Sequence, residues 1–234
     1  MINNIKKKDI LAIIPARGGS KRIKNKNIKL FLGKPIISYV IKLAIKSKIF
    51  DKIIVSTDSK KISNISLKNG AEILFQRPKK LSGDFVSTKN VIQHSINWLN
   101  KNSQKPLNVC CIYPTAVLLS LEDLKKAYQK FKLGDFEFLF SATKYSHPIE
   151  RSFQIQKGKI KMSHIKNFNK RTQDFSPSYY DVGQFYWGKV NSWLNNEIIF
   201  NKNSAIHLIP KDKVQDIDTL DDWKFAEKLY SIKK

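Results

Sequence analysis

The sequence predicts an α/β protein built on a mostly parallel sheet that helices cover on both faces. Two observations support this prediction. Short β-rich runs alternate with amphipathic helical patterns over the first two thirds of the 234 residues, and such alternation is typical of parallel strands joined by helical crossovers. A glycine-rich basic loop also follows the first strand, at the edge of the sheet where α/β proteins bind their ligands.

The expected elements follow one another in a regular order. The strands are Ile10–Pro15, Lys52–Ser56, Glu72–Gln76, Asn108–Ile112 and Phe138–Ala142, and the helices are Ile36–Lys48, Lys60–Asn69, Thr88–Lys101 and Leu121–Lys132. Apolar residues recur at helical spacing from Ile37 to Ala44 in the first helix. Asn69-Gly70 is typical of a helix C-terminus, and Ser87 is typical of an N-cap.

The pattern changes between about residues 148 and 180. Two short alternating runs flank Lys157-Gly158, and this arrangement predicts a β-hairpin over Phe153–Gln156 and Lys159–Met162. Polar, irregular chain follows. The sheet is expected to resume with Gly183–Gly188 and Ala205–Ile209, before a last helix over Leu220–Ile232. We therefore expect one domain over residues 1–234 that carries a small inserted arm.

Composition excludes some classes of protein and leaves others open. The chain is 41% hydrophobic, which is ample for a packed core, and no apolar run approaches the ~20 residues that a membrane-spanning helix needs. The two cysteines, Cys110 and Cys111, are neighbours that a strand would point to opposite faces, so we expect a reduced, cytoplasmic protein. The formal net charge of +24 leaves nucleic-acid binding open, although the basic residues are mostly scattered lysines, as on a solvated surface.

The loop after the first strand is a candidate anion site. It comprises Ala16, Arg17, Gly18, Gly19, Ser20, Lys21 and Arg22, and Lys26 and Asn27 follow shortly after it. The two glycines allow a tight turn whose N–H groups approach an anion, and the cations around them suit a polyphosphate. The loop matches neither the Walker A motif nor G-x-G-x-x-G. An ordinary glycine turn with exposed lysines is the alternative.

Asp216 and Asp218 form a candidate metal site near the end of the chain. They lie two residues apart, so an extended segment presents both carboxylates on one face. Mg²⁺ in proteins usually takes one or two carboxylates together with phosphate oxygens and water. As an alternative, one of the two could cap the last helix, whose first turn also holds Asp221 and Asp222.

Six ordered segments together resemble the CMP–sialic acid synthetase family of cytidylyltransferases. They are residues 13–22 with 26–28 and 33–36, Val55-Ser56-Thr57-Asp58, Gln76-Arg77-Pro78 with residues 81–84, Tyr113-Pro114-Thr115-Ala116, residues 179–187, and Gln215-Asp216-Ile217-Asp218-Thr219. Residues 179–187 look most like the pseudaminic acid cytidylyltransferase branch. The resemblance implies a Rossmann-like, three-layer nucleotidyltransferase fold. It also implies transfer of CMP from CTP to an acidic nine-carbon sugar, with Mg²⁺ as cofactor and no partner among nucleic acids or membranes.

The same resemblance implies roles for individual residues. Arg17, Lys26 and Asp218 would be catalytic, and Asp216 and Asp218 would hold the metal. Arg77, Ser82 and Asp84 would join the glycine-rich loop around the nucleotide, with Arg77 on the cytosine and Asp84 supporting the loop. A surface ion pair is the alternative for Arg77.

The implied acceptor site comprises Tyr113, Thr115, Arg171, Gln173, Asp181, Gln184 and Phe185. Here the chain departs from the sialic acid enzymes, because Tyr113 stands where a glutamine commonly precedes Pro-Thr, and Gln184 replaces a small or apolar residue. Both changes favour a sugar whose substituents differ from those of N-acetylneuraminic acid, and the resemblance to the pseudaminic acid branch agrees. Legionaminic acid and Kdo stay open as acceptors, and Tyr113 could instead be a packing residue.

In this family a protruding segment packs against a second subunit. Arg171 and Gln173 lie in the corresponding stretch of this chain, so we expect a homodimer in which the arm reaches toward the partner's acceptor site. An arm that folds back on its own domain is the alternative.

Overall fold

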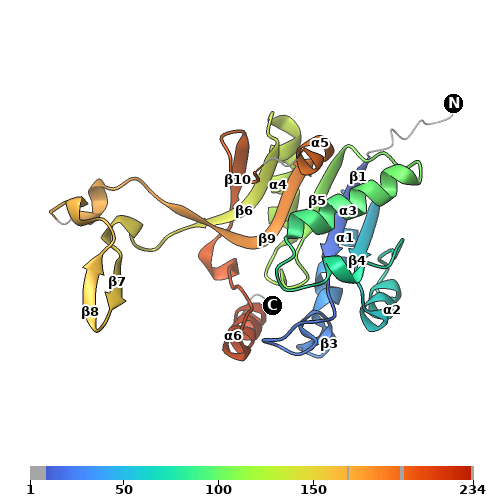
Figure 1. Ribbon diagram of the computed structural model, residues 1–234, viewed down its shortest axis with the longest axis horizontal. Helices are drawn as coiled ribbons and strands as arrows, with labels where there is room; N and C mark the ends of the chain where they lie inside the picture. Colours follow the sequence, from blue (N-terminus) through green and yellow to red (C-terminus); the bar gives the residue numbers. More distant parts are fainter. Residues whose placement is uncertain (1–8, 168, 196–197, 233–234) are drawn as a thin grey trace.

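A computed structural model describes residues 9–167, 169–195 and 198–232. Its centre is a six-stranded sheet with the order β10-β6-β9-β5-β1-β4 (Figure 1). The strands are β1 Ile10–Pro15, β4 Lys52–Ser56, β5 Asn108–Ile112, β6 Phe138–Lys144, β9 Tyr179–Lys189 and β10 Ser204–Leu208. β1 pairs in parallel with β4 and β5, and β6 pairs in parallel with β10, whereas β9 runs antiparallel between β5 and β6. The expectation of a mostly parallel sheet is confirmed.

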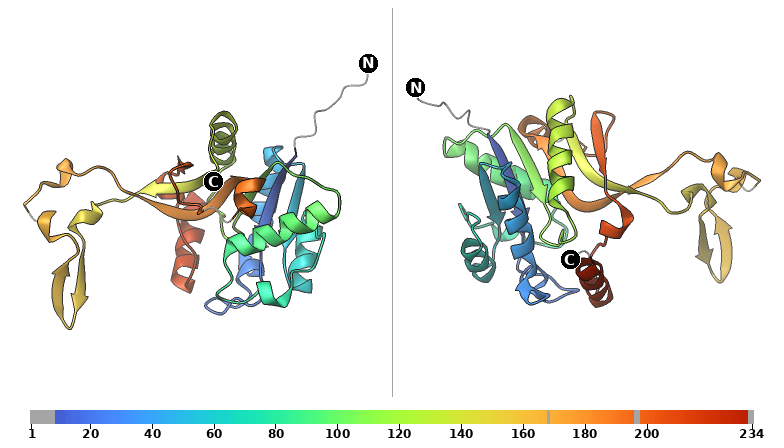
Figure 2. Two further views of the ribbon diagram at one scale, coloured as in Figure 1. Left: turned by 45° about the horizontal axis from the view of Figure 1, so that its top comes forward. Right: turned by 180° about the vertical axis from the view of Figure 1, so that it is seen from behind.

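Helices cover both faces of this sheet, as the alternation of elements predicts. On one face, α1 Ile36–Ser47, α2 Lys60–Lys68 and α4 Leu121–Leu133 bury one apolar cluster against the strands. On the other face, α3 Thr88–Lys101 and α5 Val190–Leu194 bury a second cluster (Figure 2). Cys110 belongs to the first cluster and Cys111 to the second, so their side chains point to opposite faces. The fold is therefore a three-layer α/β arrangement.

A third, smaller apolar cluster joins the loop after β1 to the last helix. The last helix, α6 Leu220–Ile232, buries Trp223 against Phe31 and Ile36. The same cluster contains Ile23, from the loop after β1, and Ile217, which stands between the two candidate metal carboxylates. Burying these side chains together holds the basic loop and the acidic segment next to one another, although about 190 residues of chain separate them.

Short elements complete the structure. A small hairpin pairs β2 Leu30–Phe31 with β3 Lys34–Pro35. The 3-10 turns are η1 Lys26–Ile28, η2 Lys79–Leu81, η3 Ile149–Arg151, η4 Ile165–Asn167, η5 Thr172–Asp174 and η6 Lys211–Lys213. Within the described residues, no helix is long and apolar enough to cross a bilayer.

The expected strand at Glu72–Gln76 is wrong. Glu72 makes one bridge with Ile54 of β4, and the next backbone contact on this side of β4 is from Arg77 N to Thr57 O at 2.8 Å. Between these points the segment leaves the sheet. The side chain of Phe75 packs against His94 and Trp98 of α3, at ring-centroid distances of 5.0 and 5.4 Å. Packing against the helix therefore replaces a continuous ladder.

The segment between β6 and β9 projects from the body as an arm (Figure 1). It carries the predicted hairpin, with β7 Phe153–Gln156 paired antiparallel to β8 Lys159–Met162. Its strands are exposed along nearly their whole length, and Ile155 and Ile160 face each other in the register with 75% and 73% of their surfaces exposed. The alternative in which the arm folds back on its own domain is therefore wrong for this structure.

Gly188 lets two aromatic side chains close the second core cluster. A Cβ at this position would lie 2.5 Å from Trp193 Nε1 and 2.7 Å from the ring of Phe138. Both rings are fully buried and cannot move aside. We predict that Gly188→Ala lowers the free energy of unfolding by about 1–3 kcal/mol, measured by denaturant titration. Gly19→Ala, where a Cβ meets nothing within 4 Å, is the control and should leave it unchanged; equal effects of the two changes would contradict the prediction.

Candidate functional site

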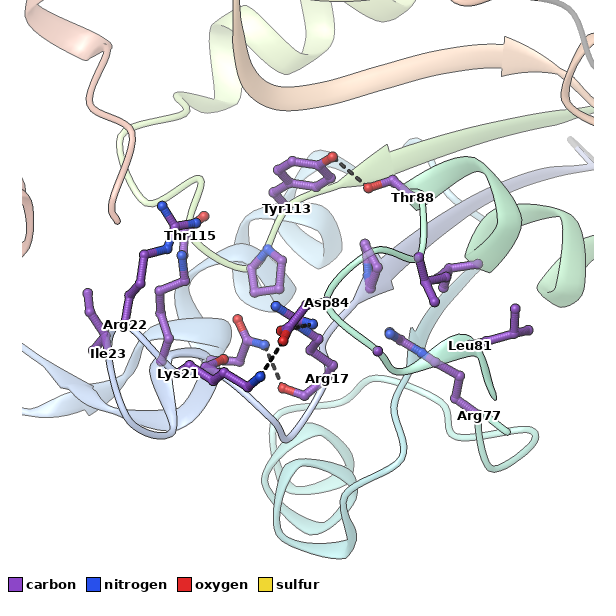
Figure 3. Close-up of a pocket in the computed structure, with 18 residues that line it drawn as sticks. Arg17, Lys21, Arg22, Ile23, Arg77, Leu81, Asp84, Thr88, Tyr113 and Thr115 are labelled. Carbon is purple, nitrogen blue, oxygen red and sulfur yellow. Dashed lines mark hydrogen bonds and ion pairs between the residues drawn. The ribbon is translucent and has the colours of Figure 1, made fainter. Parts of the chain in front are cut away.

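A cavity of about 380 Å³ opens where the loop after β1 meets the segments that follow β5 and precede α3. Figure 3 shows its basic and aromatic side chains. Its predicted members are Arg17, Ser20, Lys21, Arg22, Lys26, Asn27, Arg77, Asp84, Tyr113 and Thr115; the other lining residues are Pro15, Ile23, Leu81, Gly83, Val86, Thr88, Val91 and Pro114. Five cations thus surround one cavity, as a site for a polyphosphate requires.

Asp84 holds the basic loop in place. One of its carboxylate oxygens lies 2.8 Å from Arg17 Nη1 and the other lies 2.6 Å from Lys21 Nζ (Figure 3). The hydrogen bond from Lys21, with the charges of both cations, lowers the pKa of Asp84. The carboxylate is therefore ionised at neutral pH and pairs with two cations of the loop. An incoming phosphate has to compete with it for both cations.

Two backbone N–H groups of the loop are engaged within the protein. Gly18 N donates to Asp58 Oδ1 at 2.8 Å, and Ala16 N donates to Ser56 O at 2.9 Å. Ala16, Gly18, Gly19 and Ser82 lie outside the cavity lining. A Cβ on Gly18 would stand 3.0 Å from Ser59 Cβ, so this glycine allows the loop to approach the end of β4 closely. Asn27 Nδ2 also donates to Arg17 O at 3.0 Å and so holds the start of the loop.

Arg77 is buried, with only 4% of its surface exposed. Its Nε donates to Ser56 Oγ at 3.2 Å and its Nη2 donates to Ser56 O. Burial lowers its pKa to about 10, which still leaves it charged at neutral pH. The alternative of a surface ion pair is wrong. The guanidinium is a rigid donor in the cavity wall, held from behind by the end of β4.

The acidic segment meets the basic loop directly. Arg22 Nη1 lies 2.6 Å from Asp218 Oδ2, and Lys26 Nζ lies 3.3 Å from Asp218 Oδ1 and 2.7 Å from Ile217 O. Burial, together with the charge of Asp218, raises the pKa of Asp216. A carboxylate in that position favours a cation beside it. In the described part of the chain no group of three or more His, Cys, Asp or Glu side chains could hold a metal.

A second cavity, of about 420 Å³, shares Tyr113 with the first. Its other lining residues are Tyr180, Asp181, Val182, Gly183, Val214, Gln215 and Asp216. Tyr113 OH lies 2.7 Å from Thr88 Oγ1, and burial raises the pKa of Tyr113 to about 12. Next to it, Tyr186 OH donates to Asp181 Oδ2. A partly buried tyrosine whose hydroxyl is bonded to Thr88 therefore lies between the two cavities.

Several residues assigned to the acceptor site lie elsewhere. Phe185 is fully buried in the first core cluster, because β9 is irregular beside Gly183 (φ +60°): the Oγ of Ser141 accepts from the N–H groups of both Gln184 and Phe185. Strict alternation would have placed Phe185 with Asp181 and Gly183 on the cavity side.

Gln184 also departs from its assigned place, since only 4% of its surface is exposed and its Nε2 donates to Lys213 O at 2.6 Å. Arg171 and Gln173 lie on the arm, away from both cavities of their own chain (Figure 1). Arg171 pairs there with Asp174 at 3.0 Å. Thr115 lines the first cavity instead of the second.

Some residues of the site carried no assigned role in the sequence. Asp58, Thr88 and Tyr186 each orient a residue that does: the Gly18 amide, the Tyr113 hydroxyl and the Asp181 carboxylate, respectively. Asp58 and Tyr186 fall within segments that carry the family resemblance. Thr88 carries no such signal, because only packing of the α3 N-terminus against β5 brings it to Tyr113.

The fold and the two joined cavities define a nucleotidyltransferase-like protein, and comparison with known families agrees. The chain belongs to the cytidylyltransferase family, whose model matches residues 11–181. It is 44% identical over 223 residues to the pseudaminic acid cytidylyltransferase of Campylobacter jejuni serotype O:2, which covers 95% of this chain and 96% of that protein. A CMP-N,N'-diacetyllegionaminic acid synthase of the same organism is 33% identical, over 96% of each chain.

A solved structure confirms the fold. The CMP:2-keto-3-deoxy-manno-octonic acid synthetase complexed with CTP aligns with a TM-score of 0.71 over 96% of this chain and 99% of that chain. The two sequences are only 14% identical, so this likeness concerns the fold alone.

Gly18 and its neighbour Gly19 provide a matched test of the loop. We predict that Gly18→Ala pushes the loop away from Ser59 and weakens CTP binding about tenfold, the equivalent of ~1.4 kcal/mol. Gly19→Ala meets open space and should bind CTP as the unchanged protein does. Calorimetric titration with CTP in the absence of any acceptor measures both. Equal affinities of the two variants would show that close contact with β4 does not shape the loop.

Proposed function

We propose that the protein transfers CMP from CTP to pseudaminic acid and releases pyrophosphate. The main support is the position of the acidic pair at the junction of two cavities. Asp218 contacts Arg22 and Lys26, which line the cationic cavity, while Asp216 lines the second cavity. A triphosphate in the first cavity and an acidic sugar in the second would meet between these carboxylates. The family and the identity to the Campylobacter enzyme support the same reaction.

The donor set fits Mg²⁺. Two carboxylates, one with a pKa raised by burial and by its neighbour's charge, suit a hard cation that completes its shell with phosphate oxygens and water. Asp216 and Asp218 would hold this ion, which when bound would neutralise phosphate charge and polarise a phosphate oxygen. In this structure Arg22 and Lys26 both form ion pairs with the carboxylate of Asp218. In the proposed reaction they turn to the phosphates and leave the carboxylate to the metal.

The cations of the first cavity would position and stabilise the reacting phosphates. The sugar hydroxyl attacks the α-phosphorus and releases its proton to solvent. The bond between the α-phosphorus and the oxygen that bridges to the β-phosphorus breaks, and pyrophosphate departs with that oxygen. Charge grows on the leaving group during this step, and Arg17 and Lys26 are the donors we assign to it. Lys21 and Arg22 would neutralise the outer phosphates. This chemistry needs positioning and charge compensation more than a covalent intermediate.

Arg77 is assigned to the cytosine. Its buried guanidinium stands in the cavity wall near Leu81, on the far side of the cavity from Arg22 (Figure 3). Because two of its donor groups are held by Ser56, the plane of the guanidinium is fixed. A fixed planar donor suits recognition of a base carbonyl. Ser82, which donates to Pro78 O at 3.2 Å, shapes the turn before Asp84.

The second cavity would receive the acceptor sugar. Thr88 already engages the hydroxyl of Tyr113, so the tyrosine offers the sugar mainly its ring. An aromatic face favours a sugar with apolar substituents at this point over one rich in hydroxyl groups. The higher identity to the pseudaminic acid enzyme than to the legionaminic acid enzyme supports the same choice. N-acetylneuraminic acid, legionaminic acid and Kdo are the alternative acceptors. A reaction that consumes CTP is further expected in the cytoplasm.

The reaction is tested with the purified protein, CTP, Mg²⁺ and a panel of acidic sugars. We expect pyrophosphate release with pseudaminic acid at a kcat/KM at least tenfold above that with N-acetylneuraminic acid, legionaminic acid or Kdo, since specificity is a difference in transition-state binding. A higher kcat/KM with another sugar would identify that sugar as the acceptor and leave the proposed type of reaction unchanged. The absence of pyrophosphate release with every sugar would reject the proposed function. Binding to a long DNA duplex that weakens steeply with salt would instead favour a nucleic-acid-binding protein.

We further propose that two chains form a homodimer through the arm. A two-stranded hairpin is only marginally stable alone in water. Here Phe153, Ile155 and Ile160 expose 60%, 75% and 73% of their surfaces on one face of the hairpin. A second copy would cover this face. Arg171 and Gln173, which contact neither cavity of their own chain, are the residues that the arm would bring to the partner's acceptor site.

Charges on the apolar face of the arm should separate the subunits. We predict that Ile155→Asp with Ile160→Asp converts a dimer into a monomer at micromolar concentration, because the interface would have to bury two unpaired carboxylates. Gln154 and Lys161 form the neighbouring cross-strand pair on the opposite face, so Gln154→Asp with Lys161→Asp is the control and should stay dimeric. Light scattering measures both masses. A monomeric unchanged protein, or dimers in both variants, would exclude this interface.

A further inference from the structure

We infer that Asp222 is the positioning residue of the acidic pair, since one carboxylate fixes the backbones of both Asp216 and Asp218. Asp222 is the second acidic residue of the first turn of α6. It contacts neither cavity. The inference rests on the proposed function, because it concerns how the two proposed metal carboxylates are held.

The contact with Asp218 is direct. Asp222 Oδ2 accepts a hydrogen bond from Asp218 N at 3.1 Å. The same oxygen accepts from Thr219 N and from Thr219 Oγ1, both at 2.7 Å. Asp222 N in turn donates to Thr219 Oγ1 at 3.2 Å. This is the reciprocal arrangement of a capping box, extended by one residue so that it also includes the backbone of Asp218.

The contact with Asp216 passes through Gln215. Gln215 Nε2 donates to Asp222 Oδ1 at 3.0 Å and to Asp216 O at 2.7 Å. The amide therefore ties the carbonyl of Asp216 to the second oxygen of Asp222. Between the two anchored residues, Ile217 is fully buried in the third apolar cluster. The segment from Gln215 to Thr219 is thus held at every residue, and both candidate ligands have little freedom to turn.

Asp221 shows that charge at the helix end does not explain these contacts. It occupies the same first turn and offers the same negative charge to the helix dipole. Its side chain, however, is 94% exposed and lies 3.7 Å from Lys224. The two aspartates thus share the electrostatic role, and Asp222 alone contacts the backbone of Asp218. Asp221 is therefore a matched control for Asp222.

The experiment compares Asp222→Asn with Asp221→Asn. Each protein is saturated with CTP in the absence of any acceptor, Mg²⁺ is added in steps, and the rise in melting temperature gives the apparent affinity for the ion. Residues that orient metal ligands typically change metal affinity about 10- to 100-fold when replaced. We expect Asp222→Asn to weaken the apparent Mg²⁺ affinity at least tenfold and Asp221→Asn to change it less than twofold. Where the protein transfers CMP, the Mg²⁺ concentration for half-maximal rate should rise in parallel.

A purely structural role predicts a different result. If Asp222 served α6 alone, Asp222→Asn would lower the melting temperature without ligands and leave the Mg²⁺ affinity equal to that of Asp221→Asn, and the inference would be wrong. Should Asp222→Asn fail to fold, Gln215→Met removes only the link to Asp216 and leaves the capping box intact. We expect it also to weaken Mg²⁺ binding, and an unchanged affinity in that folded variant would overturn the inference.

The outcome is separable from that of the proposed function. Asp218→Asn removes one of the proposed metal ligands. Its Mg²⁺ affinity in the same titration therefore shows how large the effect of losing a ligand is. If the protein releases pyrophosphate but Asp222→Asn and Asp221→Asn have the same Mg²⁺ affinity, the proposed function stands and the inference about Asp222 is wrong. If the protein releases no pyrophosphate with any sugar, the proposed function is wrong. The Mg²⁺ titration still reports whether Asp222 orients the acidic pair.

Discussion

The contact between Asp218 and the cations Arg22 and Lys26 is the interaction on which the site depends. It joins the first loop of the chain to the last segment before α6, at distances of 2.6 and 3.3 Å. Ion pairs that are partly exposed contribute little by themselves. The third apolar cluster, in which Ile23 and Ile217 are buried together, holds the two segments in place, and the charges then set their register. Without this closure the basic loop and the carboxylates would be separate surface features.

The free protein pairs its reactive cations with its own carboxylates. Arg17 and Lys21 contact Asp84, and Arg22 and Lys26 contact Asp218. Such pairing keeps the basic side chains near their working positions in the absence of a ligand, so a triphosphate exchanges partners instead of ordering a mobile loop. Preorganisation of this kind lowers the entropic cost of binding. The overall charge of +24 adds long-range attraction for anions but contributes no specificity.

Tyr113 lies between the first cavity and the second. The side chains around its hydroxyl are polar. Thr88 bonds its hydroxyl, and Tyr186 bonds Asp181 beside it. Buried hydroxyl groups with partners are rigid, so this wall has one shape. Gln184 lies behind the wall, where its buried Oε1 has no hydrogen-bond partner among the described residues, and its Nε2 contacts Lys213, just before the acidic segment. The acceptor cavity is therefore shaped from three separate stretches of the chain.

The sequence by itself determined the local features: the six strands of the sheet, the helices α1, α2, α3, α4 and α6, the hairpin of the arm, the basic loop and the pair of aspartates two residues apart. The short helix α5 was not among the expected elements. Periodicity and turn residues are local signals, and these elements follow from them. Tertiary packing decided the rest. It removed the strand at Glu72–Gln76, because Phe75 packs on α3, and the irregular β9 turned Phe185 into the core. It also directed the Gly18 amide to the side chain of Asp58, 40 residues further along the chain. These outcomes depend on which side chains meet across the folded chain, and no local pattern contains that information.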